Sequence, residues 1–102
     1  TTPENIEMIA PHATLTSGMA YKIGRIVIFS AVIKIDGGMS SEEILLQFSG
    51  VTAISRFDFP MFASNSILSG GYLGVRTNKI LLNGSEISGS PYVFISGTFV
   101  CS

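Results

Sequence analysis

Charged residues are scarce in this sequence. They make up 13% of its 102 residues, about half the usual share of roughly 25%, and the formal net charge is −1. Because no basic cluster is present, the chain lacks the electrostatic footprint of nucleic-acid-binding proteins and of polybasic membrane patches. Hydrophobic residues reach 46%. A small domain with so few charges leaves much apolar surface, which we expect other chains to cover.

Histidine and cysteine each occur once, as His12 and Cys101. A single cysteine excludes an intrachain disulfide, and this pair cannot supply the three or four nitrogen and sulfur ligands that zinc sites need. Nucleophilic catalysis by serine or cysteine needs a base such as histidine within reach, and no G-x-S-x-G motif accompanies His12. We therefore expect no enzymatic activity, no catalytic residue, no metal and no cofactor.

Long apolar runs are also missing. Arg25, Lys34 and Asp36 interrupt the longest run before it reaches the roughly 18 residues of a membrane-spanning segment. The first residues, TTPENIEM, lack the basic-then-apolar order of a signal peptide and do not begin with methionine. We expect a single domain over residues 1–102, without membrane insertion, that belongs to a longer protein.

What the sequence does contain is a series of short apolar runs separated by glycine, serine, asparagine and proline. Such runs predict strands, and no segment predicts an amphipathic helix. The predicted strands lie in 6–16, 25–36, 44–48, 53–57, 71–82 (two strands that meet at Thr77–Asn78) and 92–100. Turns are predicted at Gly37–Gly38 and Asn83–Gly84, and a bend at Pro60. Seven to nine mostly antiparallel strands predict an all-β fold, either an antiparallel β-sandwich or a jelly roll.

The segment 25–36 is apolar on both faces in its first half. Because side chains alternate along a strand, one face is wholly apolar and predicts a core position for Val27, Phe29, Ala31, Ile33 and Ile35. The opposite face starts with Ile26 and Ile28 and becomes polar at Lys34. The segment 92–100 has the same property. Two such strands predict assembly with other copies, and we expect a homotrimer; the alternative is a central strand covered on both sides within one subunit.

Several motifs together resemble the C-terminal head domains of bacteriophage tail-fibre and receptor-binding proteins. YKIGRIVIFSAVIKIDGG is similar to their opening strand, K-(I/V)-G-(N/R)-x-V-x-(I/V)-S, and FDFPMF to a Leu-Pro-Phe-like segment. GYLGVRTNKILLNG resembles their late hairpin, and YVFISGTFVC their terminal I-S-G-x-(Y/F) strand. The resemblance covers residues 14–101. The chain has no tryptophan, which many saccharide-binding heads use for stacking.

The resemblance implies a trimeric β-sandwich or jelly-roll head in the C-terminal part of a fibre or baseplate protein. Such a head sits at the tip of the phage tail, contacts other tail or baseplate proteins, and binds saccharide at the host cell surface. The alternatives are a structural trimerisation cap without its own receptor site and a jelly-roll signalling domain like those of the C1q and tumour-necrosis-factor superfamily. An enzyme is the last alternative.

A saccharide site needs aromatic faces beside charged or amide groups. Two segments, SRFDFPMFASN and GGYLGVRTN, offer these groups in the residues Arg56, Asp58, Asn65, Tyr72 and Arg76. Tyr72 and Arg76 are four residues apart, so a strand would place both on one face with Gly74 between them. In the alternative interpretation Arg56 pairs with Asp58, the neighbouring phenylalanines are core and Tyr72 packs at an interface. The next candidates are the loops 37–41 and 83–90.

Overall fold

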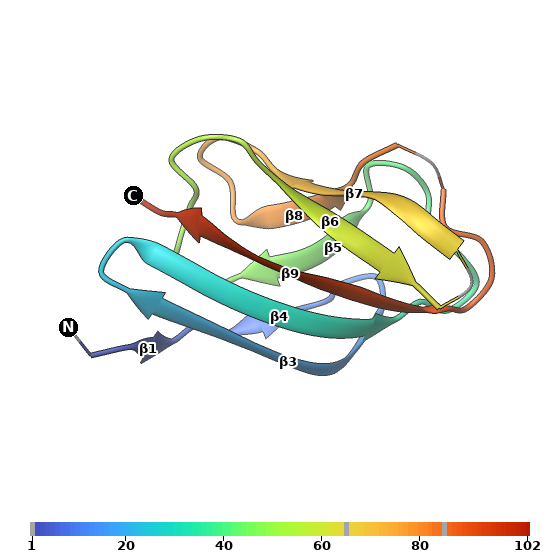
Figure 1. Ribbon diagram of the computed structural model, residues 1–102, viewed down its shortest axis with the longest axis horizontal. Helices are drawn as coiled ribbons and strands as arrows, with labels where there is room; N and C mark the ends of the chain where they lie inside the picture. The colour runs from blue at the N-terminus through green and yellow to red at the C-terminus, as the bar shows by residue number, and fades with distance from the viewer. Residues whose placement is uncertain (1, 65, 85) are drawn as a thin grey trace.

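The computed structural model describes residues 2–64, 66–84 and 86–102, with the backbone alone for residues 66–69 (Figure 1). Within these ranges nine strands form one antiparallel sheet. The strands are β1 (Glu4–Asn5), β2 (Met8–Ile9), β3 (Thr14–Ile23), β4 (Ile26–Lys34), β5 (Ile44–Phe48), β6 (Phe57–Ala63), β7 (Ser66–Leu73), β8 (Lys79–Leu82) and β9 (Tyr92–Val100). The same ranges contain no helix long and apolar enough to cross a membrane. The predicted all-β, antiparallel fold is confirmed.

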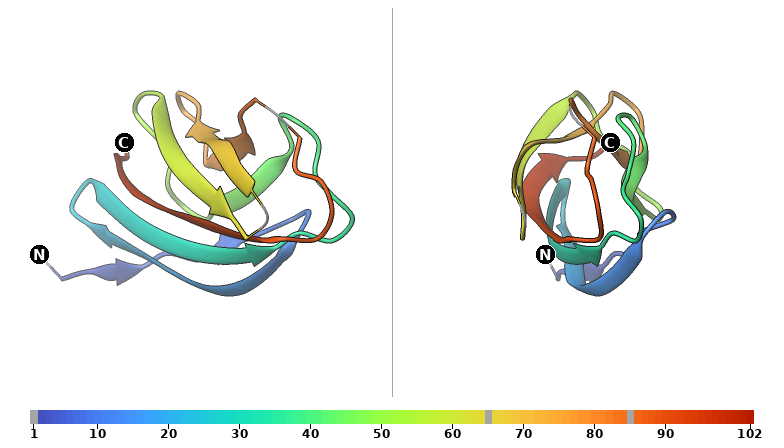
Figure 2. Two further views of the ribbon diagram at one scale, coloured as in Figure 1. Left: turned by 45° about the vertical axis from the view of Figure 1, so that its right-hand side comes forward. Right: turned by 90° about the vertical axis from the view of Figure 1, so that its right-hand side faces the viewer.

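The strands follow the order β1-β3-β4-β9-β6-β7-β8-β5-β2 across the sheet. The sheet curls, and the two views of Figure 2 show the strands enclosing an interior. One wall of this curled sheet contains β3, β4, β9 and β6. The buried apolar side chains fill the space between the two walls.

The strands β4 and β9 pair over nine residues, from Ile26–Val100 to Lys34–Tyr92, without a shift of register. The prediction that alternate residues of these strands face the core is confirmed. The inward-facing side chains are buried, with Val27, Ile33, Val93 and Phe99 at most 1% exposed. The outward-facing Ile28 and Phe94 are 45% and 46% exposed. The alternative of a strand covered on both sides within one subunit is therefore wrong.

Phenylalanines from four strands form the centre of the core. The ring of Phe29 meets Phe59 and Phe48 edge-on, with centroids 5.0 Å and 5.2 Å away. Phe99 lies 5.3 Å from Phe48. Such aromatic pairs add about 0.5–1.5 kcal/mol each beyond the area they bury. Gly97 makes room for Phe59, because a Cβ atom at this position would lie 2.3 Å from the ring. The glycine thus lets β6 pack closely against β9.

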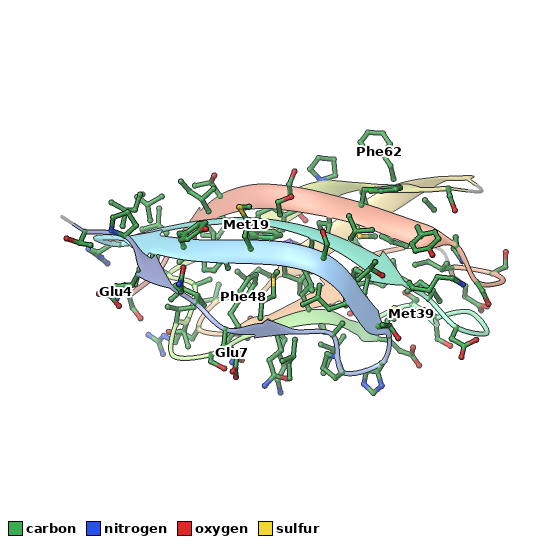
Figure 3. The ribbon with its side chains drawn as sticks, turned by 90° about the horizontal axis from the view of Figure 1, so that it is seen from below. Glu4, Glu7, Met19, Met39, Phe48 and Phe62 are labelled. Atoms are coloured by element: carbon green, nitrogen blue, oxygen red, sulfur yellow. The ribbon has the colours of Figure 1, made fainter. Side chains whose placement is uncertain are left out.

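The N-terminal segment joins the two edges of the sheet. Its first strand, β1, pairs with β3 at one edge, and β2 pairs with β5 at the other. Between these pairs, the N–H of Ile6 donates to the carbonyl of Ala20, and the N–H of Ser49 donates to the carbonyl of Glu7, both at 2.9 Å. Figure 3 shows Glu4 and Glu7 along this segment. Backbone groups that edge strands would otherwise offer to other chains are used here within the molecule.

The prediction of a strand at 53–57 with a bend at Pro60 is wrong. The strand β6 instead spans Phe57–Ala63 and carries Pro60 in its middle, where the register with β7 shifts. Proline has no N–H to donate, and a bulge removes it from the hydrogen-bonded ladder without ending the strand. Ala53 forms only an isolated bridge with Cys101.

Candidate ligand-binding site

Three of the predicted site residues lie together on the outer surface of the sheet. Arg56 immediately precedes β6, and Asp58 is the second residue of that strand. Asp58 pairs directly with Tyr72 of β7, and residues directly opposite each other on antiparallel strands project to the same face. Two adjacent strands therefore hold the carboxylate and the phenol ring side by side.

Arg56 contacts both of these side chains. Its Nη2 atom lies 3.0 Å from Oδ1 of Asp58, and its Nε donates to both carboxylate oxygens at 3.3 Å and 3.4 Å. The guanidinium carbon lies 4.3 Å from the centroid of the Tyr72 ring, in the geometry of a cation–π contact. The contact between Arg56 and Asp58 is therefore the one that the alternative interpretation predicted. That interpretation also placed the neighbouring phenylalanines in the core, which is true of Phe59 but not of Phe62, whose side chain is exposed.

The fourth member of the site, Glu42, was missed by the sequence analysis. The hydroxyl of Tyr72 donates a hydrogen bond to Oε2 of Glu42. Glu42 lies in the turn before β5, where its φ is 69° and its N–H donates to the carbonyl of Leu82 at 2.8 Å. Glu42 and Tyr72 are 30 residues apart, and nothing in the local pattern links them. We call Glu42, Arg56, Asp58 and Tyr72 the Tyr72 cluster.

Electrostatic contacts in the Tyr72 cluster shift two pKa values. The hydrogen bond to Glu42 raises the pKa of Tyr72 above its ordinary value of 10.0, and partial burial and the negative charge of Glu42 act in the same direction. The positive charge of Arg56 opposes this shift. The hydrogen bond and the charge of Asp58 raise the pKa of the Arg56 guanidinium. Both shifts favour a charged guanidinium and a neutral phenol at neutral pH.

The structure does not bring Arg76 into the Tyr72 cluster. The strand β7 ends at Leu73, and the chain turns over residues 74–77, where the N–H of Thr77 donates to the carbonyl of Gly74. Arg76 has a φ of 60° and its N–H donates to the carbonyl of Ala53. The prediction that Tyr72 and Arg76 share a strand face is therefore wrong, because the strand ends between them. Asn65 lies outside the described residues.

The end of the molecule carries a hollow of about 490 Å³. Apart from Glu43, its lining comes from the two loops that the sequence analysis placed second. The lining residues are Gly37, Gly38, Met39, Ser40, Glu43, Glu86, Ile87, Ser88 and Gly89. The isolated bridge between Met39 and Ile87 holds the two loops together. The hollow is open and mostly polar, and it is the second candidate site.

The Tyr72 cluster has the chemistry of a binding site. Carboxylates accept hydrogen bonds from hydroxyl groups, a guanidinium donates them, and a phenol ring offers an apolar face. In the described part of the chain, no group of three or more histidine, cysteine, aspartate or glutamate side chains is arranged to hold a metal ion. Cys101 is buried, and His12 is exposed in the turn between β2 and β3.

Comparison with protein-family models, with curated proteins and with solved structures gives no match for this chain.

Proposed function

We propose that this chain is the receptor-binding head domain of a bacteriophage tail fibre or baseplate protein, and that the Tyr72 cluster recognises saccharide on the host cell surface. In this proposal three copies assemble at the tail tip, next to other tail or baseplate proteins. The two facing walls of the curled sheet fit subunits of β-sandwich or jelly-roll type. Further support comes from the motifs over residues 14–101 that resemble such head domains.

The observation that carries the adhesive function is the exposed position of the Tyr72 cluster. The side chains of Arg56 and Asp58 are 52% and 63% exposed, and ion pairs so exposed contribute little to folding stability. Their hydrogen-bonding groups can therefore exchange partners with a ligand at low cost. A sugar ring that stacks on the covered face of Tyr72 takes the place of the guanidinium, which remains bound to Asp58.

Rigid strands support this site. Asp58 and Tyr72 are paired strand residues, so their backbones are fixed before a ligand arrives. Binding groups held on a rigid scaffold lose less conformational entropy when the complex forms. Saccharide sites commonly combine an aromatic face with a few oriented polar groups, which is the composition of the Tyr72 cluster.

An array of bacterial cell-wall saccharides tests the proposal directly. The parent domain should bind one class of saccharide, and Tyr72→Ala and Asp58→Ala should each weaken that binding about tenfold or more, as the loss of one good contact does. Lys79→Ala is the matched control, because Lys79 is an exposed cation on β8 outside the cluster. If the parent bound a saccharide and both cluster variants bound it equally well, the site would be wrong.

A second candidate function is a structural trimerisation cap without a receptor site. The specific observation in its favour is the exposure of outward-facing apolar residues on β4 and β9, such as Ile28 and Phe94. A cap would assemble as strongly as the proposed head but would bind no saccharide on the array. Assembly without binding would therefore favour the cap over the receptor-binding head.

A further inference from the structure

Large apolar side chains gather on the outer side of one wall of the curled sheet. They come from four neighbouring strands, and each exposes more than a third of its surface. We call them the outer apolar face, which consists of Met19, Tyr21, Ile23, Ile26, Ile28, Phe62, Tyr92 and Phe94. In Figure 3, Met19 and Phe62 lie on the outer side of the sheet, whereas Phe48 lies in the interior.

The register of the strands brings these residues together in two groups on one wall. Tyr21 of β3 lies opposite Ile28 of β4, and the next outward pair along the same strands is Ile23 with Ile26. These residues form one group of the face.

The second group lies further along the same wall. Phe94 of β9 lies between Val32 of β4 on one side and Phe62 of β6 on the other. The two groups are separated by the pair Ser30–Ser96, whose side chains are small and uncharged.

The outer apolar face is also nearly free of charge. Along β4 and β9, which the structure describes completely, the outward positions carry one charged residue, Lys34, at the border of the face. Its Nζ donates to the carbonyl of Ser90 at 2.8 Å and lies 5.5 Å from the centroid of the Tyr92 ring. The ammonium group is thus turned to the end of the sheet, away from the centre of the face.

The area of the face matches what one partner of a stable complex buries. With eight large side chains exposed by 37% to 59%, the face presents on the order of 800 Å² to solvent. The largest apolar patch of a typical monomer is about 300–600 Å². One partner in a standard stable interface buries about 800 Å². A surface this large and this apolar costs free energy as long as water covers it.

We infer that the outer apolar face is the surface through which copies of this chain associate, with the faces of three copies turned toward a common axis and packed against one another. A second copy fits because the face is apolar, uncharged at its centre and equal in area to one partner of a standard interface. The inference rests on the assembly in the proposed function and names the surface that carries it. It does not depend on the saccharide site.

The decisive variant is Ile28→Asp, because Ile28 lies inside the face and yet is 45% exposed in the single chain. An aspartate there stays hydrated in the isolated subunit, so the domain should fold. In the assembly it would be buried without a partner, which is strongly unfavourable. Ile9→Asp is the matched control, because Ile9 is also 45% exposed but lies on β2 at the other edge of the sheet.

Light scattering and sedimentation over a concentration series measure the effect. The parent and Ile9→Asp should have the mass of an oligomer at about 100 µM, and Ile28→Asp should raise the dissociation constant more than about 100-fold. Phe94→Lys, in the second group of the face, should do the same. Circular dichroism and thermal unfolding of dilute protein confirm that each variant is folded.

The inference would be overturned if the parent were monomeric at about 100 µM, or if the Ile28→Asp and Phe94→Lys oligomers were as stable as that of Ile9→Asp. An equal loss of assembly in Ile9→Asp would overturn it as well. Association of the parent only with a different protein added to the solution would also overturn it. These outcomes are separate from the saccharide test, since Tyr72→Ala leaves the outer apolar face unchanged. If the cluster variants lost saccharide binding as expected while Ile28→Asp still assembled like the parent, the receptor-binding proposal would remain. The outer apolar face would then not be the surface of association.

Discussion

The outer surface of this curled sheet has two unlike regions, the outer apolar face on β3, β4, β9 and β6, and the Tyr72 cluster where β6 meets β7. Both are exposed in the single chain. The outer apolar face consists mainly of apolar side-chain surface, so burial against another surface removes its free-energy cost. The polar groups of the Tyr72 cluster already satisfy one another, so the cluster is stable in water and available for exchange.

In the proposed function, this difference assigns association between copies to one region and recognition of a ligand to the other. Apolar burial is not directional, and its strength grows with area, which suits a permanent contact between copies. Hydrogen bonds from fixed carboxylate and guanidinium groups are directional, which suits discrimination among hydroxyl patterns. One strand contributes to both regions, because β6 carries Asp58 in the Tyr72 cluster and Phe62 in the outer apolar face.

The largest effect should come from comparing two phenylalanines on opposite sides of β9. Phe99→Ala should lower the free energy of unfolding by about 3–5 kcal/mol, because the ring is fully buried and contacts other aromatic rings. Phe94→Ala should cost less than about half of that in dilute protein, since its ring is exposed. Chemical denaturation at low protein concentration checks both values. Equal losses would mean that Phe94 is already covered within a single subunit.

The stability of the parent and of Phe94→Ala can also be compared at high protein concentration. If the outer apolar face is buried between copies, the parent should gain stability as its concentration rises, by mass action. Phe94→Ala should lose most of that concentration-dependent gain, in addition to its smaller loss of stability in dilute protein.

A smaller effect should appear in the pH titration of Tyr72. Its pKa is raised in the folded chain, because ionisation breaks the hydrogen bond to Glu42 and places two negative charges together. The resulting stabilisation is fully present below the ordinary pKa of 10.0 and is lost as the pH rises through the raised value. The phenolate absorbance of the parent minus that of Tyr72→Phe should therefore show a midpoint above 10.0. Glu42→Gln should move this midpoint downward; an unchanged midpoint would contradict the contact.

The smallest effect should follow from removing the ion pair. Asp58→Asn should leave the midpoint of thermal unfolding equal to that of the parent within experimental error. The Arg56–Asp58 ion pair is exposed, and its two residues are only two positions apart in the chain. The same variant should still weaken saccharide binding if the Tyr72 cluster is the site. A large loss of stability would show instead that the cluster is structural.

The sequence predicted much of the fold because alternation and turn residues are local signals. The predicted strands 44–48 and 92–100 match β5 and β9. The sequence of β4 also predicted which of its residues face the core and which face outward. Local signals failed at Pro60, where a bulge keeps the strand continuous, and at residues 14–23, which form one long strand β3 rather than the end of a short one. Neither the bulge nor the curl of the sheet has a simple sequence pattern.

The candidate site was predictable only in part, for the same reason. Arg56 and Asp58 lie close together in sequence, and Tyr72 lies in the segment 71–82, where strands were predicted. Glu42 reaches the site from a turn in which its φ is positive, and the alternation of apolar and polar residues does not predict such a turn. Arg76 is not part of the cluster, because β7 ends before it and the chain turns at Gly74.

The pairing of β4 with β9 has a consequence for how the chain reaches this structure. These two strands are neighbours in the sheet, yet Ile26 pairs with Val100, and four strands lie between them in chain order. Hairpins such as β3–β4 can close early from local contacts, but the aromatic core needs Phe99 and cannot close before β9 arrives. On the ribosome, the earlier strands would wait with their inner faces open until the ninth strand emerges, the stage at which they are most exposed to aggregation.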